Sequence, residues 1–166
     1  MDAYIKTALW KHFGASLDML EQAITSCPDE VWGTSFAFGE FWYITYHTLF
    51  WLEVYLSDGL QGFTPQAPFG LSELDPDGTF PERVYHQEQL LNYLDYNRQK
   101  AKQRIANLTE EKAQQVCIYG NNQGNVFDIL LDNMRHVQHH TAQLYLLLRQ
   151  KTHSAPTWIT RTKEAL

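Results

Sequence analysis

Residues 40–56 read EFWYITYHTLFWLEVYL. Apolar and aromatic side chains recur at every third or fourth position on both sides of this segment, a spacing that predicts an α-helix. One stripe is centred on His47, and the opposite side carries Phe41, Trp42, Leu49 and Leu52. A helix that is apolar on both sides is buried on both sides. We therefore expect the His47 stripe to face the domain core, and the other side to face a loop or a second copy of the chain.

The remaining sequence predicts three more long helices and no strand. The first covers residues 2 to about 27 and ends because Pro28 disfavours helical backbone in the residue before it. Another begins at Thr79-Phe80-Pro81-Glu82, which matches a capping box, and continues to about residue 108. The last covers residues 125 to about 149, with Asn125 as its N-cap. Residues 109–111 indicate a short helical turn, and residues 119–124 a turn-rich break.

A long connection separates the second predicted helix from the third. Residues 57–78 are rich in glycine and proline and predict a crossover loop, and loops of this length are usually functional or structural crossovers. Four helices with one long connection favour an all-α fold, a four-helix bundle. The length of 166 residues suits one domain, so we expect residues 1–166 to form a single unit.

Composition narrows the classes of partner. The 13 basic and 19 acidic residues give a net charge of −6, which argues against nucleic acid or an anionic membrane as the main partner. There is no apolar segment long enough to span a membrane and no signal-peptide pattern at the first residues, so we expect a cytoplasmic location. Cys27 and Cys117 are too isolated to form a thiolate metal site or a disulfide framework.

The positions of three of the seven histidines predict a metal site. His136 and His140 are four residues apart, so both imidazoles project from one face of the last helix, toward the interior. His47 occupies the centre of the inward stripe on the second helix. Taken alone, each feature is more often structural, but their combination favours a divalent metal. Three neutral imidazoles that leave positions open describe a catalytic type of site, with zinc or nickel as the expected ion.

The other four histidines have weaker claims. His12 lies on an inward stripe and could be a fourth ligand, a partner of a ligand or a core residue, of which we favour the core. His139 points mostly outward and could replace His140 only if the helical phase differs. His86 and His153 are expected to be solvated.

Two segments resemble known motifs. Residues 41–51, FWYITYHTLFW, resemble the second-helix motif of the DinB-like superfamily, and residues 136–144, HVQHHTAQL, resemble its last-helix HxxxH motif. The resemblance extends through the order of the helices and the long crossover. It implies a four-helix bundle, often a homodimer, that holds a divalent metal on His47, His136 and His140.

The resemblance also implies a class of activity. Characterised members include thiol S-transferases and a mycothiol-dependent maleylpyruvate isomerase, in which the metal activates a low-molecular-weight thiol such as bacillithiol or mycothiol. Many family members carry Arg-Gly-Gln after the last ligand, whereas this chain has Thr141-Ala142-Gln143. That difference puts any anion-binding role of the arginine in doubt.

Two functions follow as hypotheses. The first is a metal-dependent enzyme that activates a thiol or water to attack a small electrophile, inside an aromatic pocket formed by Tyr43, Phe50 and Trp51. The alternative is a non-catalytic metal-binding or stress-associated protein. In both cases we expect a homodimer that pairs through the outer side of the second helix, with Phe41, Trp42, Leu49 and Leu52 at the interface.

Overall fold

The computed structural model describes residues 1–37, 39–120 and 122–166. Within these residues there are four long helices: α1 (Ala3–Thr25), α3 (Phe41–Tyr55), α4 (Gln87–Ala106) and α6 (Val126–Thr152). Shorter helical elements are α2 (Asp29–Trp32), α5 (Glu110–Gln114) and the 3₁₀ turn η1 (Ser72–Leu74). The predominantly helical class predicted from the sequence is confirmed.

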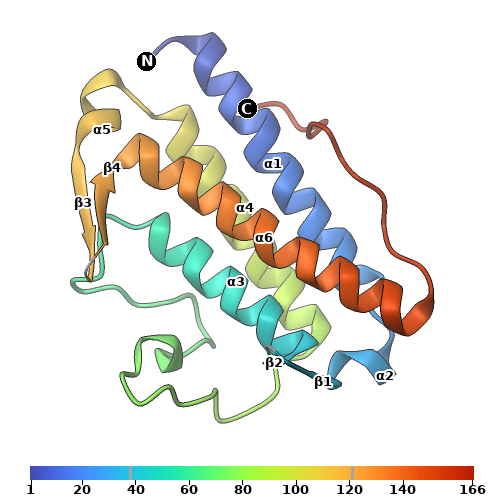
Figure 1. Ribbon diagram of the computed structural model, residues 1–166. Helices are drawn as coiled ribbons and strands as arrows, with labels where there is room; N and C mark the ends of the chain where they lie inside the picture. The colour runs from blue at the N-terminus through green and yellow to red at the C-terminus, as the bar shows by residue number, and fades with distance from the viewer. Residues whose placement is uncertain (38, 121) are drawn as a thin grey trace.

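The long helices contact one another in a closed ring. α6 packs against α1 and α3, and α4 packs against the same two helices from the other side (Figure 1). The core lies between the four helices. Its largest fully buried side chains include Trp10, Phe13, Tyr46, Phe50 and Tyr93. No helix in the described part of the chain is both long and apolar enough to cross a membrane.

Side-chain caps begin α1 and α6, and the cap at Asn125 is the one that the sequence predicts. The Asp2 carboxylate accepts a hydrogen bond from the Tyr4 amide at 2.6 Å, and the Asn125 side chain accepts one from the Asp128 amide at 2.9 Å. Each bond satisfies an amide that the first helical turn leaves without a partner. The short turn predicted at residues 109–111 is α5, capped in the same way by Thr109.

The predicted start of the third long helix is wrong. α4 begins at Gln87, eight residues after Thr79, and the backbone amide of His86 donates to the Gln89 side chain at its start. The Thr79 hydroxyl instead donates to the Asp75 carboxylate at 2.7 Å, which closes a local turn. Thr79 thus belongs to a turn of the crossover and not to the start of a helix; residues 79–86 are not helical, and the crossover between α3 and α4 extends to His86.

The expectation of no strands is also wrong. β1 (Ser35–Phe36) pairs with β2 (Gly39–Glu40), and β3 (Val116–Tyr119) pairs with β4 (Asn122–Asn125), both antiparallel. In β3, exposed and buried residues alternate, and the two buried side chains, Cys117 and Tyr119, face the helices. Residue 121, inside the predicted turn-rich break, lies outside the described residues. Cys27 and Cys117 are both buried free thiols.

The orientation of α3 differs from the prediction. Phe41, Trp42, Leu49 and Leu52, which we expected at an interface with a second copy, are at most 4 % exposed within the single chain. His47 and its neighbours Tyr43, Trp51 and Tyr55 are only partly buried. The His47 side of α3 thus faces solvent more than the opposite side does. A homodimer stays a prediction, but these four residues cannot form its interface.

The crossover is held to α3 and α4 by buried polar contacts. Glu53 of α3 is 1 % exposed, and its carboxylate accepts hydrogen bonds from the Gln66 amide at 3.0 Å and the Tyr93 hydroxyl at 2.6 Å. Further along, the Tyr46 hydroxyl of α3 contacts the Gly70 carbonyl at 3.2 Å and the Ser72 hydroxyl at 3.3 Å. These contacts bring the 3₁₀ turn η1 against the partly exposed side of α3.

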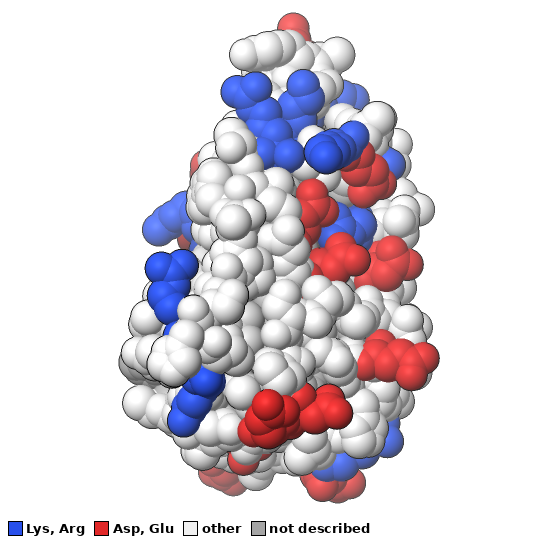
Figure 2. All heavy atoms as spheres, turned by 90° about the vertical axis from the view of Figure 1, so that its right-hand side faces the viewer, with Lys and Arg blue, Asp and Glu red and all other residues white. Residues whose placement is uncertain are grey.

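The segment after α6 returns along α1 (Figure 1). The Trp10 indole donates to the Glu164 carbonyl at 3.0 Å, and the Thr162 amide donates to the Lys11 carbonyl at 2.9 Å. Figure 2 shows this face of the molecule, where Lys and Arg gather toward the upper end and left edge while Asp and Glu lie lower and to the right. Side chains of both signs therefore share the surface.

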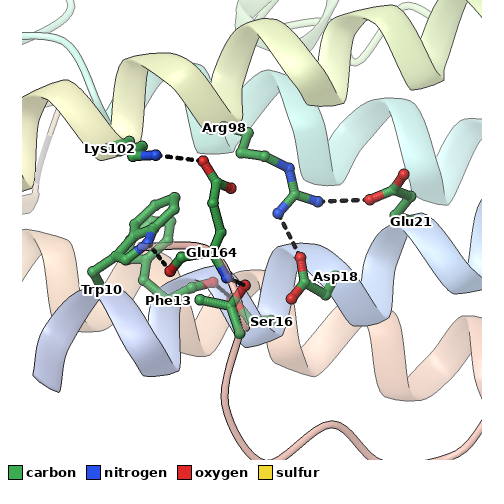
Figure 3. A network of polar contacts seen from close by, with 9 residues as sticks. Trp10, Phe13, Ser16, Asp18, Glu21, Arg98, Lys102 and Glu164 are labelled. Atoms are coloured by element: carbon green, nitrogen blue, oxygen red, sulfur yellow. Dashed lines mark hydrogen bonds and ion pairs between the residues drawn. The ribbon is translucent and has the colours of Figure 1, made fainter. Parts of the chain in front are cut away.

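An ion-pair cluster joins α4 to α1 near this segment. Arg98 donates to Asp18 at 2.5 Å and to Glu21 at 2.8 Å, and its side chain is 10 % exposed. Figure 3 shows the guanidinium directed at both carboxylates, with Lys102 directed at Glu164 beside it. We call Arg98, Asp18 and Glu21 the Arg98 cluster.

Candidate metal centre

His47 of α3 and His136 and His140 of α6 converge on one point. One ring nitrogen from each lies within 4.8 Å of the other two. The ring centres are 4.9 Å apart for His47 and His140, 5.5 Å for His47 and His136, and 4.6 Å for His136 and His140. The packing of α3 on α6, together with the four-residue spacing on α6, brings the rings together. We call these three residues the histidine cluster.

Two of the three imidazoles are oriented by neighbouring side chains. His47 Nδ1 lies 2.6 Å from Glu73 Oε2, and His140 Nδ1 lies 2.7 Å from Gln143 Oε1. A carboxylate oxygen or an amide oxygen can only accept, so in both rings Nδ1 is the protonated nitrogen. In the neutral form of each ring, Nε2 therefore carries the free lone pair that a metal ligand requires.

The environment keeps the α6 histidines neutral. Burial, followed by the neighbouring imidazoles, lowers the pKa of His136 from 6.5 to about 3. Burial also lowers the pKa of His140 to about 4, although the hydrogen bond to Gln143 partly opposes the change. Neutral imidazole is the form that binds a metal.

Aromatic side chains surround the cluster on its α3 side. The rings of Tyr43 and Trp51 are each centred 6.4 Å from that of His47, and the ring of Tyr55 is centred 6.2 Å from that of His136. Tyr43 and Trp51 are the predicted wall residues and do flank His47, whereas Phe50 is fully buried in the core. The partly exposed rings leave the cluster accessible from solvent.

A comparison with known families identifies the type of protein. The family model for the DinB superfamily matches residues 12–144. The chain belongs to the DinB superfamily. The matched span contains the whole histidine cluster and the crossover, so the resemblance found in the sequence is confirmed. No curated protein matches the chain.

The departure of this DinB chain from the expected Arg-Gly-Gln sequence has two different consequences. Gln143, which is retained, contacts His140 and also approaches His139 Nε2 at 3.3 Å. Thr141, in place of arginine, is fully buried, and its hydroxyl has no hydrogen-bond partner among the described residues. The glutamine is therefore positioned to orient a histidine, while Thr141 offers nothing to a ligand at the surface.

Of the remaining histidines, His139 lies beside the cluster, with its ring centred 5.0 Å from that of His140, but it is not one of the three that converge. His139 is exposed, as the helical phase of α6 predicts, and His86 and His153 are exposed as expected. The favoured interpretation of His12 as a core residue is wrong, because its side chain is exposed on α1 beside the returning C-terminal segment. Its helical stripe runs out of the core at that position.

Glu73 is a site residue that the sequence analysis missed. It lies in η1, and its side chain is only 5 % exposed although it carries a carboxylate. Burial by itself would raise the pKa of Glu73, but hydrogen bonds from His47, Tyr43 and Trp51 lower it below its ordinary value. The one available signal was the unusual length of the crossover that contains it.

The donors present fit a divalent first-row metal. All three are imidazoles, which suit zinc and nickel. His136 Nδ1 is buried and has no hydrogen-bond partner in the described part of the chain, which is unusual for a histidine that serves only packing. Three protein ligands at a partly exposed position would leave room for an exogenous ligand.

Proposed function

We propose that the chain binds a divalent metal, zinc or nickel, through His47, His136 and His140, and uses it in an enzyme that acts on a low-molecular-weight thiol or on water. The observation that carries this proposal is the convergence of three imidazole nitrogens within 4.8 Å at a partly exposed position. Membership of the DinB superfamily supports it, and the ring of four long helices supports a four-helix-bundle scaffold. The small molecules in question are a thiol such as bacillithiol and an electrophile.

The residues of the cluster would share the work as follows. A divalent metal bound there would act as a Lewis acid that lowers the pKa of a thiol or water molecule. His47, His136 and His140 would donate lone pairs, and Glu73 and Gln143 would hold two of the rings in the required tautomer. Tyr43, Trp51 and Tyr55 would present apolar ring surface to the electrophile.

Metal content tests the first half of the proposal. The protein is purified without a nickel column and its metal content is measured by elemental analysis, for the wild type and for His136→Ala and His140→Ala. We expect about one ion per chain in the wild type and a large loss in both variants. His12→Ala is the matched control, because His12 is an exposed histidine outside the cluster. A wild-type protein that neither retains nor takes up zinc or nickel contradicts the proposal.

Turnover tests the second half. Bacillithiol and a chromogenic electrophile are supplied to the metal-loaded protein, and the rate of adduct formation is compared with that of His47→Ala. We expect turnover in the wild type and a rate near background in the variant. Stoichiometric metal without turnover of any thiol or of hydrolysable esters would favour the non-catalytic metal-binding alternative.

A further inference from the structure

Glu73 contacts two side chains at the candidate metal site. Its Oε2 atom accepts hydrogen bonds from His47 Nδ1 at 2.6 Å and from Trp51 Nε1 at 3.1 Å. Both donors come from the partly exposed side of α3, one turn apart. The carboxylate is therefore held at a fixed place beside the ring of His47.

The backbone around Glu73 is fixed as well. On one side of it, Gly70 and Ser72 contact the hydroxyl of the fully buried Tyr46. On the other, the Leu74 and Asp75 amides donate to Leu71 and Ser72 carbonyls at 2.9 and 3.1 Å and close the 3₁₀ turn. The carboxylate is thus carried by an anchored turn and not by a free loop.

Burying a carboxylate to attach a loop carries a large desolvation penalty. Desolvation of a charged pair commonly offsets its electrostatic gain, and apolar residues of similar volume would hold the crossover at least as well. The crossover is already attached through Tyr46 and through Glu53. The distinctive effect of Glu73 falls on the ring of His47, because a carboxylate can only accept and so selects which ring nitrogen carries the proton.

We propose that Glu73 is a positioning residue, which fixes the neutral ring of His47 as the Nδ1-protonated tautomer and thereby presents Nε2 to His136 and His140. This inference rests on the proposed metal site for its purpose, but the tautomer it assigns is a property of the metal-free chain. Carboxylates that accept from a metal-binding histidine typically contribute 10–100-fold to metal affinity. Glu73 would belong to that class, although it lies 26 residues from His47 on another element.

The first experiment reads the tautomer without metal. The ¹⁵N shifts of the His47 ring are measured by NMR in the chelator-treated protein, at alkaline pH where neutral imidazole predominates. We expect the Nδ1-protonated form in the wild type and a large shift toward the Nε2-protonated form in Glu73→Leu. Glu73→Gln retains an acceptor oxygen and should largely keep the wild-type tautomer.

Two control variants separate positioning from loop attachment. Trp51→Phe removes a different hydrogen bond to the same carboxylate and should leave the tautomer of His47 unchanged. Glu82→Gln alters an exposed acid on the same crossover and should change neither tautomer nor metal affinity. If Glu73 served only to attach the crossover, Glu73→Leu would lower the melting temperature and leave the tautomer unaltered, and that result would overturn the inference.

The second experiment measures affinity for Zn²⁺ alone, by competition with a chelating indicator. We expect Kd to rise about 10-fold in Glu73→Gln and about 100-fold in Glu73→Leu, the two ends of the usual range. An unchanged Kd in Glu73→Leu overturns the inference. A wild-type chain that binds no Zn²⁺ but keeps the Nδ1-protonated ring would refute the proposed function and leave the positioning of His47 by Glu73 supported.

Discussion

Arg98 of α4 faces Asp18 and Glu21 of α1, whereas His47 of α3 faces His136 and His140 of α6. Both clusters join two long helices through ionisable side chains. In the Arg98 cluster a cation lies between two anions, so opposite charges meet at 2.5 and 2.8 Å. In the histidine cluster three bases of the same kind meet, and protonation of any one disfavours protonation of the others.

The Arg98 cluster contains both signs of charge, whereas the histidine cluster contains three bases alone. The Arg98 guanidinium already has both of its carboxylate partners within the folded chain, so its removal should affect stability and not metal binding. The histidine cluster gains little from the mutual contact of neutral rings, and a cation between them would satisfy all three lone pairs. The two clusters should therefore respond differently to metal, pH and substitution.

Added metal should produce the largest effect. With free Zn²⁺ at about 1,000 times Kd, the free energy of unfolding of the wild type should rise by about 4 kcal/mol, and its melting temperature by roughly 8–16 °C. Thermal unfolding with and without Zn²⁺ measures this gain. His140→Gln should lose most of it, whereas Arg98→Met should keep it, and an equal gain in the two variants would mean that the clusters do not differ in this respect.

The second largest effect should come from lowering the pH, which should affect the stability that depends on the histidine cluster. Because the pKa values of His136 and His140 fall from 6.5 to about 3 and about 4 in the folded chain, the unfolded state binds more protons between those values. The free energy of unfolding of the metal-free protein should therefore fall as pH decreases from about 6.5 to about 4. Above pH 6.5 the stability that depends on the two neutral rings should be present in full.

At about pH 5 we expect a loss of roughly 2 kcal/mol relative to pH 7, about half the full value for two groups because both rings keep contact with solvent. Urea unfolding at a series of pH values measures it. His136→Gln should flatten the profile between about pH 5 and pH 7, whereas Arg98→Met should lower stability across that range.

Removal of the Arg98 cation should have a smaller effect. Arg98→Met leaves Asp18 and Glu21 without their shared partner, and we expect a loss of about 1.5 kcal/mol, near the low end for charged hydrogen bonds because the Glu21 side chain is 52 % exposed. Denaturant unfolding gives this value, with Arg135→Met as a control from an exposed ion pair. A lower zinc affinity in Arg98→Met would show that the two clusters are coupled.

Thr141→Val should have the smallest effect and the opposite sign. The Thr141 hydroxyl is buried without a hydrogen-bond partner among the described residues, so an apolar side chain of the same shape should raise stability by about 1 kcal/mol. Metal affinity should stay as in the wild type. A loss of metal on this substitution would indicate that the hydroxyl serves the site after all.

The sequence was informative where helical periodicity applies. The helix repeat places the side chains of His136 and His140 on one face of α6, and the same repeat places His139 on the exposed face. The core-facing side of α3 could not be predicted in this way, because a helix with apolar residues on every side has no phase to measure. The structure nevertheless brings His47 together with His136 and His140, because the partly exposed side of α3 lies beside α6.

Other features depend on contacts that periodicity does not encode. Thr79 and Glu82 match a capping box, but Thr79 lies in a turn of the crossover, where its hydroxyl donates to the Asp75 carboxylate. Glu73 reaches His47 only because Tyr46 and Glu53 attach the intervening crossover to α3. Such pairs are separated by irregular backbone, and their proximity follows from the packed structure.

The position of the Trp51 indole beside His47 also allows the site to be followed by fluorescence. Of the five tryptophans, Trp51 has its indole ring 6.4 Å from that of His47 and shares a carboxylate with it. A paramagnetic ion such as Ni²⁺ or Co²⁺ at the histidine cluster would quench the emission of this indole, and Trp51→Phe would remove the response. The chain therefore carries its own fluorescent reporter of occupancy, with no label attached.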